Sequence, residues 1–251
     1  LLSLAYAWGL WLTGQVDRSE PYLDAAADGW DREEAKGVAN PDRRRWRAGG
    51  TALRIQLVRH RGDLDGAIRF SEETLALAPP DDPLVCGYGH LGLAHAYREL
   101  GAYDASLTSY AKGKDAMRRA GNASSACLTA FYESRLLQRQ GRPQEALGVV
   151  KDAMAWMDGQ AGEEDPAHGI LHVALGSLLC EASRLAEAED HVQRGRALSR
   201  RGGHHDYVRH AAMAMTRLRL ALGDGEGALD AIREAESAKV AEEMPLPSAE
   251  T

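Results

Sequence analysis

Two histidines four residues apart, His168 and His172, form the pattern that most directly suggests chemistry. An HxxxH spacing puts two imidazoles on one face of a helix, where both can bind a metal ion such as zinc. No third ligand is evident close to them, although His204 and His205 are candidates. We interpret His204 and His205 as a surface pair beside a glycine turn, and we predict no metal site.

The patterns of common catalytic sites are missing. The sequence has no GxxxxGK[ST], which would form a phosphate-binding loop, and no GxSxG, which would hold a nucleophilic serine. The stretch Gly223 to Gly227 is rich in glycine, but acidic residues alternate with the glycines and would repel a phosphate. We therefore predict that the chain is not an enzyme and that it holds no cofactor of its own.

A third set of residues combines arginine, amide and aromatic side chains at related positions in successive segments. Forked guanidinium contacts and aromatic stacking can bind an anionic or hydroxyl-rich ligand. We predict that the set lines a concave binding surface. The alternative is an ordinary solvated helix face with internal ion pairs, for example between Arg98 and a nearby Glu. The set comprises Gln56, Arg59, Tyr88, His95, Arg98, Phe131, Arg135, Gln138 and Arg217.

These positions correspond because the chain repeats itself about every 40 residues, after a longer first interval of about 48. In each unit, about fifteen residues of helical period lead to a turn, and a second amphipathic segment follows it. The pattern predicts an all-α fold, a right-handed superhelix of about six antiparallel helix pairs. The turns lie at Gly14, Gly62, Gly101, Gly141, Ser183 and Gly223.

A small residue recurs at the same place after each turn. A glycine in the turn can adopt the left-handed conformation that ends a helix, and small side chains just beyond it let paired helices approach closely. We expect these positions to lie between the paired helices. They are Ser19, Ala67, Ser106, Ala146, Ala188 and Ala228.

The helix-pair units resemble tetratricopeptide repeats, most clearly at Arg61 to Pro83 and Leu91 to Tyr110. The longer units, for example Leu178 to Gly203, resemble the superhelical domain of large ATP-dependent LuxR-type transcription regulators of the maltose-regulon activator kind. The resemblance covers nearly the whole chain. We assign residues 1–236 to a repeat domain of this type and residues 237–251 to a tail or the start of a linker.

The resemblance implies a sensor and interaction module. Regulators of this family carry an ATPase before the domain and a helix-turn-helix after it, so we expect ATP in a neighbouring domain and DNA contact only through another domain. The implied partner is a small-molecule inducer or a regulatory protein or peptide held in the concave groove, with self-association as a further expectation. The alternative is a scaffold or co-chaperone array that captures a peptide tail without switching.

Composition sets further bounds. The chain has 251 residues, 44% of them hydrophobic and 27% charged, and a net charge of −7, which argues against nucleic-acid binding by the chain as a whole. Three distant cysteines without a CxxC motif favour a reduced, cytoplasmic setting. Leu1 to Leu12 is apolar but lacks a basic flank, so we predict neither a signal peptide nor a membrane span. We expect a preceding domain to cover this segment.

The run Arg43 to Arg47, RRRWR, combines basic residues with an aromatic one, as nucleic-acid sites do. Acidic residues surround it in the sequence, at Asp31, Glu33, Glu34 and Asp42. We interpret the run as a solvated, partly neutralised start of a helix.

Overall fold

The computed structural model describes residues 2–12, 15–37, 39–40, 42–79, 81–160, 165–202 and 205–243, and their side chains except those of residues 12, 205 and 237–243. The turn predicted at Gly14, the imidazoles of His204 and His205, and the end of the predicted tail from Met244 lie outside this description.

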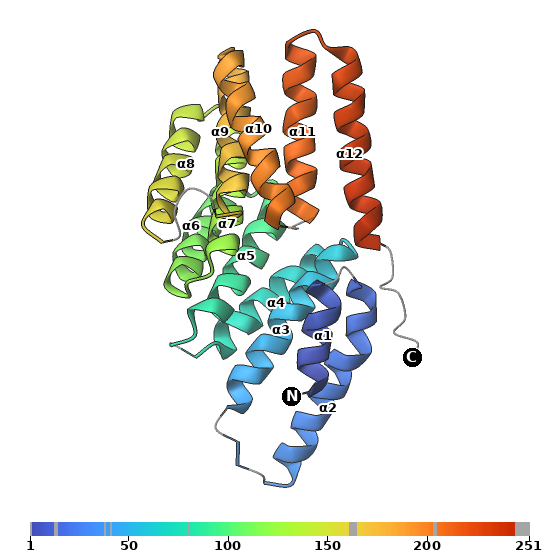
Figure 1. Ribbon diagram of the computed structural model, residues 1–251. Helices are drawn as coiled ribbons and strands as arrows, with labels where there is room; N and C mark the ends of the chain where they lie inside the picture. Colours follow the sequence, from blue (N-terminus) through green and yellow to red (C-terminus); the bar gives the residue numbers. More distant parts are fainter. Residues whose placement is uncertain are drawn as a thin grey trace. The chain divides into compact units, whose positions relative to one another are not determined.

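The described residues form twelve α-helices and one 3-10 turn, with no strand among them (Figure 1). This confirms the predicted all-α class. The bounds are α1 Leu2–Leu12, η1 Val16–Ser19, α2 Glu20–Ala35, α3 Arg43–His60, α4 Leu64–Leu77, α5 Pro83–Glu99, α6 Tyr103–Arg119, α7 Ala123–Arg139, α8 Pro143–Asp158, α9 His168–Glu181, α10 Leu185–Gly202, α11 His205–Ala221 and α12 Gly225–Glu243.

The chain divides into two compact units, the first holding α1 to α6 and the second α7 to α12. Within each unit, consecutive helices form antiparallel pairs, such as α3 with α4 and α9 with α10 (Figure 1). Helix α12 continues to Glu243, while the domain boundary at residue 236 stays a prediction. In the described part of the chain, every helix is too short or too polar to span a bilayer.

The turns inside the pairs fall where the sequence predicts them. Gly62, Gly101, Gly141 and Gly223 have φ values between 72° and 77°, and Ser183 adopts the same left-handed conformation with φ 59° despite its side chain. At Gly101 the N–H of Ala102 donates to the carbonyl of Tyr97 over 2.9 Å. This hydrogen bond closes the last turn of α5 in the manner of a Schellman motif.

The small residues after the turns are buried, as expected. Five of the six have no exposed surface, and Ala228 is 2% exposed. At one of these positions, the hydroxyl of Ser106 on α6 donates to the carbonyl of Ala94 on α5 over 2.7 Å. In the second unit, a Cβ added at Gly195 of α10 would lie 2.8 Å from the carbonyl oxygen of Gly169 on α9. Paired helices therefore approach to a distance that larger side chains would prevent.

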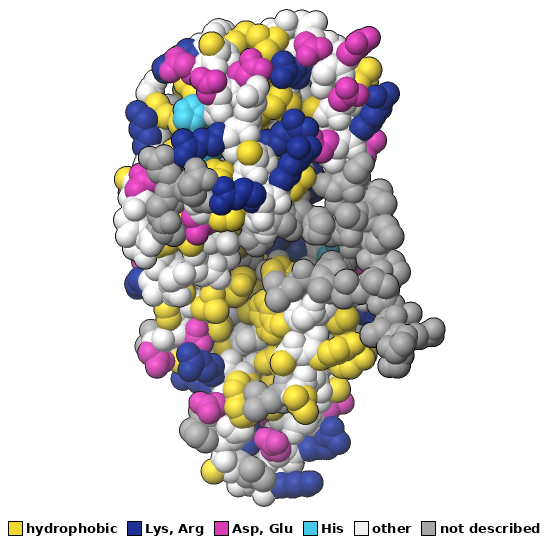
Figure 2. Space-filling model, in the orientation of Figure 1, with side chains coloured by type: hydrophobic (Ala, Val, Ile, Leu, Met, Phe, Trp, Pro, Cys, Tyr) yellow, Lys and Arg dark blue, Asp and Glu magenta, His cyan; other side chains and the backbone are white. Residues whose placement is uncertain are grey.

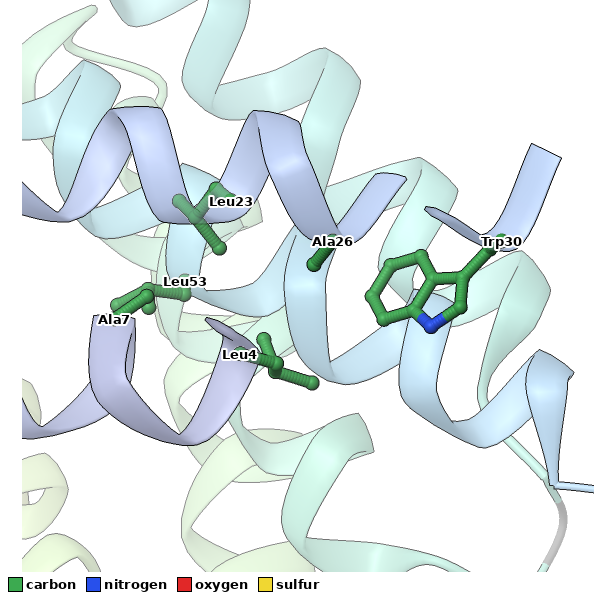
Figure 3. Close-up of a cluster of buried hydrophobic side chains, with 6 residues drawn as sticks. All are labelled: Leu4, Ala7, Leu23, Ala26, Trp30 and Leu53. Carbon is green, nitrogen blue, oxygen red and sulfur yellow. The ribbon is translucent and has the colours of Figure 1, made fainter. Parts of the chain in front are cut away.

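The first unit begins with a core between α1, α2 and α3, drawn in Figure 3. Its buried side chains are Leu4, Ala7, Leu23, Ala26, Trp30 and Leu53. The opposite face of α1 is exposed, since Leu2 is 88% and Tyr6 50% accessible. Hydrophobic side chains are accordingly visible over α1 (Figure 2). The predicted cover of this segment by another domain stays a prediction.

The basic run at the start of α3 is bonded into the first unit rather than simply solvated. Arg44 donates to the carbonyls of Ala76 and Leu77 at the end of α4, over 2.9 and 3.0 Å. Arg45 pairs with Asp82 at 2.7 Å. Asp82 itself caps α5 by accepting from the backbone of Val85.

Arg47 behaves as the sequence predicts. It pairs with Asp31 and Glu34, two of the acidic residues expected to neutralise the run. The guanidinium groups of Arg44, Arg45 and Arg47 are thus engaged within the chain, which leaves the run poorly suited to contact a nucleic acid.

Candidate functional site

Five of the predicted binding residues lie in the first unit, on the first helices of two pairs. Gln56 and Arg59 are on α3, and the Nη1 of Arg59 donates to the Oε1 of Gln56 over 2.9 Å. Tyr88, His95 and Arg98 are on α5. The ring of Tyr88 lies against that of Trp8 from α1, with centroids 5.4 Å apart, so it belongs to an aromatic contact rather than to the polar group.

The polar residues form what we call the His95 cluster, comprising Gln56, Arg59, His95, Arg98 and Tyr110. Tyr110 comes from α6 and is completely buried. Its hydroxyl lies 3.0 Å from the Nδ1 of His95 and accepts from the Nη1 of Arg98 over 3.2 Å. Because the phenol oxygen accepts from Arg98, its proton is available to Nδ1 of His95. A continuous hydrogen-bonded chain therefore runs from Arg98 to His95.

His95 stays neutral in this environment. Burial lowers its pKa well below the ordinary value, and the positive charges of Arg59 and Arg98 lower it further. Only 5% of the residue is exposed. The neutral imidazole fits the role of acceptor from Tyr110, and the cluster keeps its positive charge on the two arginines.

The other predicted residues lie in the second unit, and three of them surround a histidine that the sequence did not single out. We call this group the His210 cluster, comprising Phe131, Tyr132 and Arg135 of α7 with His210 and Arg217 of α11. The centroids of the Phe131 and His210 rings are 4.6 Å apart, and the guanidinium of Arg135 lies 5.5 Å from the Phe131 centroid. Arg217 is exposed.

His210 is buried but incompletely bonded. Its Nε2 lies 3.2 Å from the hydroxyl of Tyr132, whereas its Nδ1 is buried with no hydrogen-bond partner among the described residues. Burial is the main cause that lowers the pKa of His210 to about 4; Arg209, Arg135 and Arg217 lower it further, against the opposing charge of Asp206. The cluster thus combines aromatic rings, arginines and one buried nitrogen that has no hydrogen-bond partner in the described residues.

The ninth predicted residue, Gln138, sits one turn from Arg135 on α7. Its Nε2 is buried and has no hydrogen-bond partner within the described residues. The structure brings Gln56, Arg59, His95 and Arg98 together in one cluster and Phe131, Arg135 and Arg217 in another. Tyr88 and Gln138 belong to neither cluster.

Three functional candidates escaped the sequence reasoning: Tyr110, Tyr132 and His210. The helical period places Tyr110 on the packing face of α6. That period predicts a core residue and does not indicate that its hydroxyl is hydrogen-bonded. His210 stands seven residues before Arg217, as Tyr88 stands seven before His95. That repeated position, already aromatic in an earlier unit, was the available signal.

The HxxxH pair is arranged differently from a metal site. His168 and His172 both lie on α9, but the Nε2 of His168 faces Asp158 at 3.1 Å, and the Nδ1 of His172 lies 2.8 Å from the Nδ1 of His191 on α10. In the part of the chain that the structure describes, no three His, Cys, Asp or Glu side chains are grouped to hold a metal ion.

The comparisons with known proteins agree with this architecture. A family model described as "MalT-like TPR region" matches residues 50–248. No curated protein sequence matches the chain. Because the matched region runs from within α3 past the end of α12, it includes both histidine clusters.

Solved structures with little sequence identity share the fold. BtubC (BKLC) from P. vanneervenii is 16% identical, with a TM-score of 0.63 over 92% of this chain and 95% of that one. The Cut9 and Hcn1 hetero-tetramer of APC/C gives a TM-score of 0.63 at 15% identity, over 94% of this chain and 39% of that one. A putative kinesin light chain from Podosopora anserina with TPR-like repeats gives 0.55 at 16% identity, over 80% and 95%.

The chain is therefore a TPR-like repeat domain. Stacked helix pairs of this type expose extended surfaces suited to binding a protein or a peptide. The arginine, amide and aromatic groups of the two clusters can offer a ligand forked hydrogen bonds and stacking surfaces.

Proposed function

We propose that this chain, which belongs to the family of MalT-like TPR regions, is the sensor and interaction module of a multidomain transcription regulator. Its ligand is an inducer or a regulatory protein or peptide, bound by side chains from the first helices of the pairs. Binding favours one arrangement of the helix pairs and biases the neighbouring ATPase and DNA-binding domains towards the active form.

The observation that carries this proposal is the His210 cluster. Arg135 supplies positive charge beside the ring of Phe131, and the charges of Arg135 and Arg217 both act on His210. His210 has a buried Nδ1 without a partner in the described residues. Buried polar atoms in folded proteins usually have a partner. A bound ligand that reaches this nitrogen would supply one, so we place the primary contact in the second unit.

The His95 cluster supports a secondary contact. Arg98 already donates to Tyr110 and to Glu99, at 3.2 and 2.6 Å, and Arg59 donates to Gln56. A ligand there meets arginines that are held in place by other residues. Such positioning reduces the side-chain entropy that binding would otherwise cost.

The binding test uses the chain with a panel of short acidic peptides, oligosaccharides and small carboxylates, measured by isothermal titration calorimetry. Arg135→Ala should weaken the binding of any ligand found by about tenfold or more, as loss of a charge-assisted contact does. Arg98→Ala should weaken it less. Arg184→Ala is the matched control, because the side chain of Arg184 forms an exposed pair with Glu187. Unchanged binding in both cluster variants would remove the proposed site.

The regulatory part of the proposal is tested separately by reading the coding sequence on both sides of this segment. An upstream P-loop ATPase and a downstream helix-turn-helix support the regulator. Their absence, combined with tight peptide binding, would instead favour a TPR scaffold or co-chaperone domain that captures a peptide tail.

A further inference from the structure

The second unit contains an open pocket between α10 and α11 that involves none of the residues of the proposed binding surface. Its volume is about 280 Å³, and three of its six lining side chains carry a guanidinium group while none carries a carboxylate. Arg and Lys side chains gather where α10 and α11 lie (Figure 2). The lining residues are Gln193, Arg196, Ala197, Arg200, Met215 and Arg219.

Two of the three arginines already hold an oxyanion supplied by the chain itself. The carboxylate of Glu234, on α12, accepts from the Nε of Arg196 over 3.2 Å and from the Nε of Arg200 over 3.0 Å. The second nitrogens of both guanidinium groups also reach it, that of Arg200 at 2.7 Å. The side chain of Glu234 is only 14% exposed. The two arginines are therefore positioned to grip a carboxylate or a group of similar shape.

The third arginine extends the cationic lining from the opposite wall. Arg219 of α11 pairs with Glu189 at 3.1 Å, and its Nε lies 3.7 Å from Asp224. Glu189 is shared, because it also accepts from the amide of Gln193 over 3.0 Å. A guanidinium has more N–H donors than one carboxylate can accept. Three of them around one small space leave donors available for another acceptor.

We propose that this pocket binds a small oxyanion, a phosphate- or carboxylate-bearing molecule that bridges Arg196 and Arg200 on α10 to Arg219 on α11. Planar guanidinium forks match the oxygens of either group. The volume admits a phosphate or a small dicarboxylate and is too small for a folded peptide segment. Ala197 and Met215 supply an apolar surface for a short carbon chain.

The oxyanion shares Arg196 and Arg200 with Glu234. Since Glu234 is the acidic residue that these two arginines hold, its negative charge competes with the ligand for the same donors. Removing that charge while keeping the shape of the side chain should therefore strengthen binding. Binding also draws the arginines away from Glu234 and so weakens a tie between α10 and α12.

The test titrates the chain with sodium phosphate in one arm and sodium succinate in the other, at constant ionic strength set with sodium chloride. Amide chemical shifts of α10 and α11 and calorimetry report binding. We expect saturable binding with shifts in α10 and α11 and around Glu234 of α12, weakened about tenfold or more by Arg200→Gln and by Arg219→Gln. Glu234→Gln should strengthen it severalfold. Saturation with phosphate alone, succinate alone or both identifies the preferred source of the oxyanion.

Arg184→Gln is the matched control, since it removes one positive charge from the same unit at an exposed pair and should leave binding unchanged. Circular dichroism establishes that each variant is folded; where Arg200→Gln is not, Arg200→Lys replaces it and should still weaken binding by loss of the fork. Failure of both anions to saturate, equal weakening by Arg184→Gln, or no gain in Glu234→Gln would each overturn the proposal. The peptide and oligosaccharide arms of the proposed-function test are independent of these outcomes. For its carboxylate arm, Arg200→Gln and Arg219→Gln distinguish binding in this pocket from binding at the His210 cluster.

Discussion

The His95 and His210 clusters use the same kinds of side chain to different effect. Both contain a buried neutral histidine, a tyrosine hydroxyl within hydrogen-bond distance of the imidazole, and arginines nearby. In the first unit, Tyr110 joins His95 to Arg98 in a closed chain. In the second, Nδ1 of His210 has no partner in the described residues. A polar cluster whose hydrogen bonds are made within the fold stabilises it, and we call such a cluster closed. A cluster with an unsatisfied polar atom is open and can bind a ligand there.

The largest effect that follows from this comparison is on the fold of the first unit. Tyr110→Ala should lower the free energy of unfolding by about 3 to 5 kcal/mol, because it empties a site that is fully buried and removes the hydroxyl between Arg98 and His95. Urea unfolding followed by circular dichroism measures it. Tyr132→Ala is the comparison variant and should cost clearly less, since Tyr132 is only half-buried. Equal losses would break the distinction.

The second effect is the dependence of stability on pH. His210 has a pKa of about 4 when folded and 6.5 as the ordinary value, so the unfolded chain binds the extra proton first as the pH falls. The contribution of His210 to the free energy of unfolding is present above about pH 6.5. It is lost as the pH falls towards 4, by about 3 kcal/mol in all. The decline between these limits should be shallower in His210→Gln than in the wild type. His60→Gln, which removes an exposed imidazole, is the control.

The third effect isolates the hydrogen bond of the closed chain. Tyr110→Phe keeps the ring and removes the hydroxyl, leaving Nδ1 of His95 and one donor of Arg98 without it. The cost should be about 1 to 3 kcal/mol, as for a buried group left unsatisfied. Tyr132→Phe should cost less because its neighbourhood is more exposed. A larger loss in Tyr132→Phe than in Tyr110→Phe would reverse the assignment of the closed cluster.

The helix pairs were predictable because their determinants are local. A turn residue followed five positions later by a small residue can be recognised in the sequence. Gly101 and Ser106 behave as that pattern indicates, since Gly101 has a positive φ and Ser106 is buried. Even Ser183, which lacks the freedom of glycine, adopts the turn conformation because the hydrogen bond from Arg184 to the carbonyl of Leu179 closes the same motif. The repeat period then places the first helices.

The candidate site was predictable only in part because its partners come from other helices. The repeated positions located Arg98 and Arg135. The direction of a tyrosine hydroxyl, however, depends on a neighbouring helix, which the helical period of one segment does not reveal. Arg44 shows the same limit, since its acceptors on α4 are more than thirty residues away in the sequence. Helical period identifies which face is polar and leaves open which atoms on that face are already bonded.

The smallest predicted effect concerns the open cluster itself. Arg135→Gln removes a cation over the Phe131 ring, which should cost about 0.5 to 1 kcal/mol. After burial and Arg209, Arg135 is among the charges that lower the pKa of His210, so the variant should also raise that pKa. An NMR titration of the His210 imidazole measures the shift. Arg142→Gln, at an exposed pair with Glu145, should leave the titration unchanged. A raised pKa of His210 together with a small loss in the free energy of unfolding is expected if Arg135 faces a ligand site. A large loss would mean that Arg135 mainly stabilises the fold, as the residues of the His95 cluster do.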